Sequence, residues 1–516
     1  MHRQLFTKRS SSNDNQMLPE YADIPIDPSV ENNLLRVKRD MGGSDDLIMR
    51  QIHNEGINTA AAAVVYIDGL SNAMAINQYI YDVLDYSLPR YDGEDMMTLD
   101  AGTLAKKLLN GMGPVRTVSD LGSLYKNLLC GEAIILLRGH QYAYCADIRE
   151  WKGRDVTEST NQTSIRGPRE SFTETLRTNT SLIRRKIKDP RLWTETVTIG
   201  HLTKTDVTLM YINGLAKPSV LQLVRDRLSQ IKIDGILDSG YIEELIEDDK
   251  WSLFPTVYNT ELPDNAASQL LEGKVAILVE GTPNVLIAPT QMVTFFQSTE
   301  DYYQRAFYAS LLRILRFGSV FISLLFPSLY IAITTFHRDM LPASLLISLA
   351  AQREGVPFPA FFEALIMEIT FEILREAGLR MPRAIGQAVS VVGTLVIGQA
   401  AVEAGIVSAA MVIVVSITAI STFTLPAYSM SIPVRILRFA FMGVAASFGL
   451  FGIIMGFFVL MLHLCALRSF GEPFMTPLSP FQKTEMQDAL FRLPRWLLFK
   501  RPDTSLASDS SRIRRK

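Results

Sequence analysis

Four glutamates lie within one otherwise apolar stretch, and their spacing is the first sign of chemistry in the sequence. Glu368, Glu372 and Glu376 recur every four residues, so on a helix they share one face with Arg375, whereas Glu363 lies nearly opposite. Ionisable groups at membrane depth normally face a bundle interior or a water-filled path, and rings of carboxylates select cations. We therefore predict that these four glutamates select cations. The alternative is a helix at the membrane surface, with Glu372 and Arg375 as a local pair.

The apolar stretch 384–402 and the residues just after it carry a second group of candidates. Small residues let neighbouring helices approach closely, and a few hydroxyl or amide groups face water, which is the mixture that a pore-lining helix needs. The predicted pore-lining residues are Gln387, Val391, Thr394, Gly398 and Glu403. The predicted helix-packing residues beside them are Gly386, Ser390 and Gly393. Ordinary packing of a helix bundle explains the glycines equally well.

These candidates lie in a region whose composition differs from that of the rest of the chain. Of the 151 residues from 317 to 467, 14 are charged, which is about 9%, against about 25% elsewhere. About 20 apolar residues span the hydrocarbon core of a bilayer. Charge-free stretches of sufficient length occur at 317–336, 384–402, 406–426 and 439–467. Residues 340–376 add either a re-entrant hairpin or two short crossings, so the sequence predicts four or six crossings.

The distribution of basic residues predicts the orientation in the membrane. Arginines at 305, 313 and 316 flank the first span, and residues 483–516 carry nine basic against four acidic residues. Both termini are then cytoplasmic. The polar start of the chain has no apolar segment typical of an export signal, so we expect no export by that route. Four arginines conflict with this topology, which places them on the outer side: Arg380, Arg383, Arg435 and Arg438.

Several other function classes find little support in the sequence. The net charge of −2 gives no general attraction for nucleic acid. Cys130, Cys145 and Cys465 lack the spacing of metal ligands, and no phosphate-binding loop, nucleophile elbow or zinc-protease motif occurs. We therefore predict no enzyme activity, no metal site and no cofactor.

The soluble region contains an internal repeat. VVYIDGLS at 64–71 matches LMYINGLA at 209–216, and GEAIILLRG at 131–139 matches GKVAILVEG at 273–281, with offsets of 145 and 142 residues. Each YI(D/N)GL motif is an apolar strand that enters a glycine turn. We interpret it as a structural turn, with a ligand or subunit contact as the alternative. The basic segment that joins the two units either binds an anion or forms a solvated interdomain helix.

These patterns predict a fold class and a domain organisation. The fold class is an α/β soluble region with two tandem similar α/β subdomains, followed by an all-α polytopic membrane domain. The predicted parts are a disordered arm at 1–44, a first cytoplasmic subdomain at 45–160, an interdomain segment at 161–194, a second cytoplasmic subdomain at 195–300, a membrane domain of four to six transmembrane or re-entrant helices at 301–470 and a basic cytoplasmic tail at 471–516.

Residues 337–423 are specific enough to indicate a family. They contain LISLAAQREGVPFP and FEILREAG, and they resemble the membrane signature of the A subunits of GerA-type spore germinant receptors. SIRGPRESFTE, FPTVYNTELPD and DYYQRAF are similar to further blocks of that family. The resemblance covers roughly residues 45–480. One departure is Leu262, where the family pattern has an arginine.

The resemblance implies an integral protein of the endospore inner membrane that works with a transporter-like B subunit and a lipoprotein C subunit. It also implies that A subunits form a homo-oligomeric ring, a pentamer, which acts as a nutrient-gated channel for monovalent cations. One alternative is a SpoVAF-like ion-release channel that amplifies germination without sensing nutrient. Another is a secondary transporter, which the absence of a visible inverted repeat in the membrane region disfavours.

Overall fold

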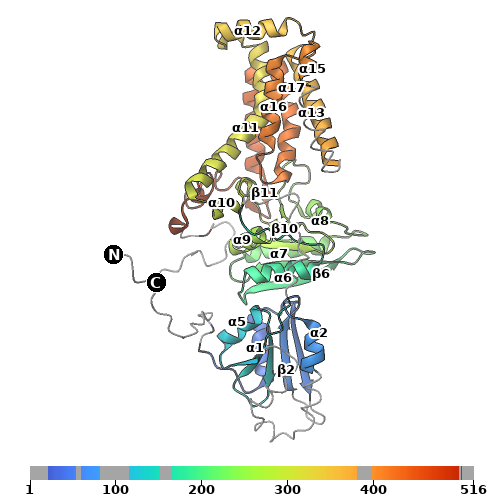
Figure 1. The fold of residues 1–516 in the computed structure, drawn as a ribbon, viewed down its shortest axis with the longest axis vertical. Helices are drawn as coiled ribbons and strands as arrows, with labels where there is room; N and C mark the ends of the chain where they lie inside the picture. The colour runs from blue at the N-terminus through green and yellow to red at the C-terminus, as the bar shows by residue number, and fades with distance from the viewer. Residues whose placement is uncertain are drawn as a thin grey trace, which may run out of the picture.

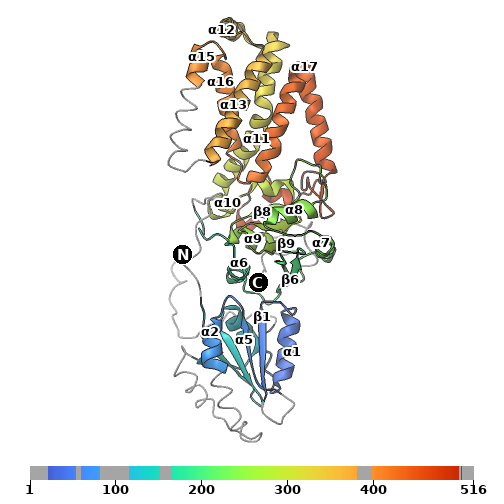
Figure 2. The ribbon, with the colours of Figure 1, turned by 90° about the vertical axis from the view of Figure 1, so that its right-hand side faces the viewer.

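The computed structural model of the chain describes residues 21, 23–53, 60–81, 115–150, 166–380, 398–498 and 501. Three parts follow one another along the long axis: a first sheet domain, a second sheet domain and a helical bundle (Figures 1 and 2). The predicted fold class, two tandem α/β units followed by a helical region, is therefore confirmed.

The first sheet domain is a five-stranded antiparallel sheet covered on both faces. Its order is β1-β2-β4-β5-β3, and its strands are β1 (Leu47–His53), β2 (Ala60–Ile67), β3 (Val115–Val118), β4 (Ala133–Leu137) and β5 (Ala143–Ala146). Helices α1 (Val30–Asp40) and α5 (Leu121–Leu129) pack on one face, and α2 (Ala73–Ala75) with the π-helix η1 (Ile76–Tyr81) lies on the other. Double coverage explains why every residue of β2 and β4 is buried.

Helix α1 lies inside the stretch 1–44, for which the sequence predicted a disordered arm. Its N-cap is Ser29, whose side chain accepts a hydrogen bond from the backbone of Asn32. Val30, Leu34 and Val37 recur at helical spacing and are buried against the first sheet. Residues 30–40 therefore belong to the core of the first sheet domain.

The second sheet domain repeats this architecture. Its order is β6-β7-β9-β10-β8, and its strands are β6 (Leu192–Ile199), β7 (Thr205–Ile212), β8 (Tyr258–Thr260), β9 (Val275–Val279) and β10 (Val285–Ala288). Helices α6 (Leu176–Lys186) and α9 (Pro263–Leu271) cover one face, and α7 (Pro218–Gln230) and α8 (Ser239–Ile246) cover the other.

The strand registers confirm the predicted repeat. Val64 pairs with Ile135 across β2 and β4, and Leu209 pairs with Ile277 across β7 and β9. These two pairs occupy equivalent places in the two sequence motifs, so the domains share strand order and register. Both sheets are antiparallel, and the rule that ligands bind at the carboxyl ends of parallel strands does not apply to the YI(D/N)GL motif.

The two motif glycines instead serve turns. Gly69 and Gly214 have φ angles of 83° and 81°, a region that favours glycine. In the first copy, Asp68 forms an ion pair of 3.2 Å with Arg177 of α6. The turn that ends β2 therefore also contacts the second sheet domain.

The segment between the domains contributes a buried ion pair. Arg184 of α6 is 1% exposed, and its Nη2 donates to Oδ1 of Asp46 at 2.7 Å, next to a second bond from its Nε. Glu170 pairs with Arg185 and Lys186. Part of the basic character of this segment is thus neutralised by contacts within the chain.

The helical bundle contains two helices that are long and apolar enough to cross a membrane, α11 (Ala306–Thr335) and α17 (Tyr428–Ala466), by length and composition within the described residues. The predicted first span at 317–336 lies in α11 up to residue 335, and α11 contains Pro327. The other bundle helices are α12 (Ala343–Arg353), α13 (Ala360–Arg380), α15 (Gly398–Glu403) and the shorter apolar α16 (Ala409–Thr422). Helix α12 lies at the end of the bundle farthest from the sheets (Figures 1 and 2).

Helix α17 is two helices joined by a reversal at Gly449, which has φ 62° and ψ −142°. A Cβ placed on Gly456 would lie 3.1 Å from the ring of Phe441. In one straight helix these residues would be roughly 22 Å apart at about 1.5 Å per residue. The two limbs, 428–448 and 450–466, therefore run side by side (Figure 2). The sequence prediction of one continuous span at 439–467 is wrong, because the charge-free run conceals a turn that only glycine adopts readily.

After α17 the chain returns to the second sheet domain. The hairpin of β11 (Arg468–Ser469) and β12 (Glu472–Pro473) begins this return, and Ser469 Oγ donates to the carbonyl of Thr256 at 2.6 Å. Phe474 is fully buried, and its carbonyl accepts from the backbone of Met292 at 2.8 Å. The start of the predicted basic tail is thus part of the folded structure.

Candidate functional site

The apolar bundle contains a buried ion pair between α13 and α17. Glu368 Oε2 lies 2.5 Å from Nη1 of Arg438, and the two side chains are 0% and 1% exposed. Nη2 of Arg438 also donates to Ser323 Oγ of α11 at 3.0 Å and to Thr422 Oγ1 of α16 at 3.1 Å. One buried guanidinium therefore joins four helices of the bundle.

A second ion pair continues the cluster toward the sheet domains. Glu372 accepts two hydrogen bonds from Arg435 of α17, one of them from Nε at 3.0 Å. Arg375 lies 4.0 Å from Glu372 and stacks over the rings of Phe423 and Tyr428, with 5.7 Å to each centroid. The local pair of Glu372 and Arg375 is present, but the closer partner of Glu372 is Arg435.

Glu363 and Glu376 have different surroundings from the other two glutamates. Glu363 is fully buried and accepts from the backbone of Ser408 at 2.6 Å and from its hydroxyl, at the start of α16. Arg353 of α12 lies 3.8 Å from it. The side chain of Glu376 is 60% exposed and pairs with Arg380 at 2.7 Å. The structure thus brings Glu368 and Glu372 together against α17 and separates them from Glu363 and Glu376.

Most of the predicted pore-lining and packing residues lie outside the described residues. These are Gly386, Gln387, Ser390, Val391, Gly393 and Thr394. Gly398 begins α15 and is buried, with room for a Cβ at 3.6 Å from Val412. Glu403 ends α15, is exposed and accepts from Gln399 at 2.9 Å. The contacts described for Gly398 and Glu403 are therefore with Val412 and Gln399, and not with the ion-pair cluster.

The sequence prediction missed the role of Arg435 and Arg438. It placed them on the outer side of the membrane, where they conflicted with the expected orientation. A signal for their role was available. Arg435 and Arg438 are three residues apart, and Glu368 and Glu372 are four apart, so each pair spans about one helical turn of an apolar stretch. Opposite charges at matched spacing on two buried helices predict a pair, because an unpaired charge there is costly.

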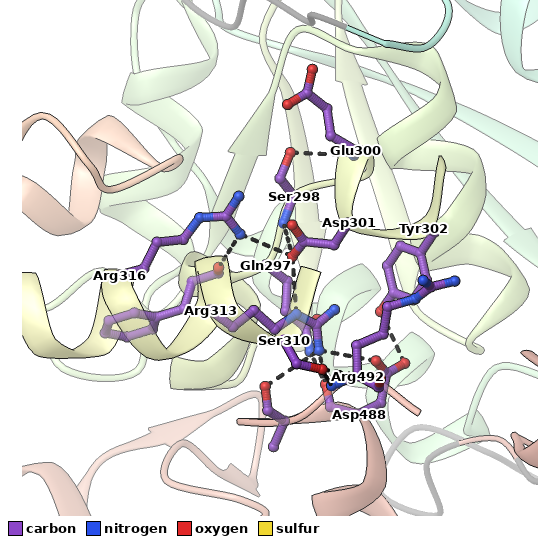
Figure 3. A network of polar contacts seen from close by, with 12 residues as sticks. Gln297, Ser298, Glu300, Asp301, Tyr302, Ser310, Arg313, Arg316, Asp488 and Arg492 are labelled. Carbon is purple, nitrogen blue, oxygen red and sulfur yellow. Dashed lines mark hydrogen bonds and ion pairs between the residues drawn. The ribbon is translucent and has the colours of Figure 1, made fainter. Parts of the chain in front are cut away.

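A second charged cluster lies where α11 meets the sheet domain and the tail (Figure 3). Arg313 of α11 is fully buried, and its Nε donates to Asp301 of α10 (Glu300–Tyr303) at 2.9 Å. Its Nη1 lies 3.0 Å from Asp488 Oδ1 in η7 (Glu485–Asp488). Arg316 shares Asp301, also at 2.9 Å. Figure 3 shows both arginines reaching Asp301 from the same helix.

Tyr302 and Arg492 complete this junction cluster. The Tyr302 hydroxyl donates to Asp488 Oδ2 at 2.9 Å, and burial raises the pKa of that hydroxyl well above its usual range, so it remains a donor. Arg492 donates to the carbonyl of Gln304 at 3.0 Å, and its backbone N–H donates to Ser310 Oγ of α11 at 3.0 Å. The junction cluster therefore fixes the first bundle helix to both the second sheet domain and the tail.

The ion-pair cluster in the bundle and the junction cluster have the same chemical character. Their members are fixed charges held by hydrogen bonds, and they join helices to one another and to the sheets. Among the described residues, no group of three or more histidine, cysteine, aspartate or glutamate side chains is placed to hold a metal ion. The described contacts are those of structural links between helices, sheets and tail.

Comparison with known proteins identifies the family. Residues 36–504 match the Bacillus/Clostridium GerA spore germination protein family. Spore germination protein KA of Bacillus subtilis (strain 168) is 47% identical over 489 residues, which cover 95% of this chain and 89% of that protein. Spore germination protein A1 of the same strain is 44% identical over 78% of this chain and 82% of its own. The uncharacterized membrane protein YfkQ of that strain is 42% identical over 94% and 93%.

One solved structure is also similar. It is the crystal structure of the N-terminal domain of the A subunit of the Bacillus megaterium spore germinant receptor GerK3, which is 38% identical. It covers 51% of this chain and 96% of that one, with a TM-score of 0.40. The family match extends over both sheet domains, the bundle and most of the tail. The chain therefore belongs to the GerA family of spore germination proteins.

Proposed function

We propose that this chain is the A subunit of a nutrient germinant receptor in the endospore inner membrane. The observation that carries the proposal is the near full-length identity of 38–47% to proteins named for spore germination, including KA, GerLA and B1. The chain is membrane-associated, in keeping with the long apolar helix α11 and the two apolar limbs of α17. In the proposed arrangement it crosses the membrane several times, with both termini in the cytoplasm.

The finer proposal is that copies of the chain form a pentameric ring that conducts monovalent cations when nutrient binds to the receptor. A transporter-like B subunit and a lipoprotein C subunit complete that receptor. The apolar bundle with its internal charges supports this proposal, because charges buried among apolar helices mark ion pathways and switches more often than plain anchors. The predicted pore residues Gln387, Val391, Thr394, Gly398 and Glu403 remain part of this proposal.

The ion pairs indicate how such a channel changes state. Glu368 and Arg438 join α13 to α17, so movement of either helix must break the pair or carry it along. Breaking a buried pair is costly, and packed helices then switch between discrete arrangements. We propose that nutrient binding shifts this equilibrium toward the conducting arrangement.

Spores test the receptor role directly. Deleting the gene for this chain should abolish the response to one class of nutrient, and a copy of the wild-type gene should restore it. Spores that keep every nutrient response would contradict the receptor role. Spores that respond to every nutrient but release ions more slowly would instead support the SpoVAF-like amplifier.

A further inference from the structure

An apolar groove runs along α17 at the end next to the sheet domains. It has a volume of about 380 Å³, within the range of ligand pockets, and both limbs of α17 line it. Phe441 and Val444 come from the first limb, and Gly456 and Val459 from the second. Trp251 and Leu253, in the loop after α8, also line it. The lining is almost entirely hydrocarbon, with His463 as its polar member.

The loop that carries Trp251 is fixed to α17. Phe254 is 4% exposed, and its ring centroid lies 6.3 Å from that of His463. Ser252 Oγ lies 3.0 Å from Nε2 of the same histidine. These contacts hold the loop in place and leave Trp251 95% exposed beside the groove. A fixed loop that presents a tryptophan outward indicates a partner surface.

The groove continues into the outward apolar face of the second limb of α17. Phe451, Ile454 and Phe458 on that limb are 57–66% exposed. Helix α8 lies in the layer of the sheet domain next to the bundle (Figures 1 and 2). Charged groups begin at the same level, where Lys250 is exposed and Asp249 accepts from the backbone of Trp251. An apolar face that ends at a tryptophan and then at charges is the pattern of a membrane interface.

We propose that this groove holds an acyl chain of a membrane lipid in the leaflet next to the sheet domains, with Trp251 at the headgroup edge. The proposal rests on the membrane association of the bundle and goes beyond the receptor role. It makes the loop after α8 an attachment of the second sheet domain to the lipid, in addition to the covalent connections through α11 and α17.

Tryptophan fluorescence in vesicles tests the proposal. The full-length chain, with Trp151, Trp193 and Trp496 replaced by phenylalanine, keeps Trp251 as its single tryptophan. It is reconstituted in phosphatidylcholine vesicles with or without bromine on the acyl chains. We expect brominated lipid to quench Trp251 strongly, and more so with bromine near the headgroup end of the chain than near its methyl end.

Two control proteins keep the outcome decisive. In a tryptophan-free background, Phe458→Trp reports on the outward face of α17 and should be quenched if the bundle lies in lipid at all. A chain that keeps only Trp193, whose Nε1 donates to Asp40 between the sheet domains, should not be quenched. If Phe458→Trp is quenched and Trp251 is not, the groove does not hold lipid, although the bundle does lie in the membrane.

A second copy of the chain is the rival occupant of the groove. In that case Trp251 would show blue-shifted emission without quenching by brominated lipid, and the shift would disappear on dilution with excess lipid. That result would overturn the proposal. Filling the groove with Ala440→Leu should reduce the quenching of Trp251, and unchanged quenching in this variant would also contradict an acyl chain in the groove.

Discussion

At the residue scale, the charge balance inside the bundle depends on complementary pairs. The side chains of Glu368 and Arg438 are at most 1% exposed, so the charge of each is compensated by the other. Removing one partner leaves a lone buried charge, whereas removing both leaves apolar side chains of similar volume. The loss of stability should therefore be much larger for a single substitution than for the double substitution.

We expect Arg438→Met to destabilise the chain by about 3–5 kcal/mol, because Glu368 would remain buried and unpaired. The double variant Glu368→Leu with Arg438→Met should recover most of that loss. Thermal midpoints of the detergent-solubilised protein measure both effects. The exposed pair of Glu376 and Arg380 provides the control, since Glu376→Gln should change stability by less than about 1 kcal/mol. Equal losses in the single and double variants would argue against the pairing.

Lys274 provides a prediction outside the membrane region. It is buried, its Nζ donates to Thr294 Oγ1 at 3.2 Å, and burial lowers its pKa from 10.5 to about 8. Between pH 8 and 10.5 the unfolded state binds more protons than the folded state, so stability rises with pH across this window.

Replacing this lysine should remove that pH dependence. Lys274→Met should raise stability at pH 7 by about 3 kcal/mol, at roughly 1.4 kcal/mol per pKa unit, and the gain should shrink toward pH 10. Thermal midpoints measured across this pH range would show the effect. Lys232→Met changes an exposed lysine and is the matched control. A gain that is constant with pH would mean that packing, and not ionisation, governs the site.

At the element scale, the reversal within α17 and the docking of α11 determine how the bundle is arranged. Sequence patterns predicted several elements well. The repeat at offsets of 145 and 142 predicted two similar sheets, since a continuous apolar run that enters a glycine turn leaves a local signature. The reversal at Gly449 left no such signature, because a glycine inside an apolar helix usually marks close packing.

Gly449→Ala should disrupt the reversal. An added Cβ would lie 2.9 Å from His337 Cε1 and 3.2 Å from Phe336 Cβ, at a φ of 62°. The expected loss is about 1–3 kcal/mol from backbone strain, with the clash in addition. Gly443→Ala is the matched control. Its Cβ would meet nothing within 4 Å, and a helix-interior alanine should stabilise by about 0.5–1 kcal/mol. Similar thermal midpoints for both variants would contradict the reversal.

The junction cluster predicts how the tail is held. Arg313→Lys keeps the charge but loses the planar fork that reaches Asp301 and Asp488 together. We expect the tail from about residue 474 to become accessible to limited proteolysis while the sheet domains stay protected. Arg468→Lys, at an exposed position of the β11–β12 hairpin whose guanidinium donates to the carbonyl of Gly471, should leave the pattern unchanged. Equal tail cleavage in wild type and Arg313→Lys would contradict this role.

At the scale of the whole molecule, contacts connect the two sheet domains, the helical bundle and the returning tail. The family and the fold class could be predicted from the sequence, because long sequence blocks and periodic burial are local patterns. The sequence held only a general sign that Glu368 and Glu372 pair with arginines. Their particular partners lie 70 and 63 residues away, and the pairing depends on how α13 and α17 pack. The proposed pore lining depends on the assembly of several copies of the chain.

The proposed function requires that the assembled receptor conducts cations in response to nutrient, and potassium flux from vesicles measures this conduction. The chain should be purified with its receptor partners and reconstituted in potassium-loaded vesicles. We predict that nutrient triggers potassium release, that chloride does not replace it as the permeant ion, and that enlarging Gly398 alters the rate. An intact complex that binds nutrient but releases no potassium would contradict the proposal that the receptor is a nutrient-gated cation channel.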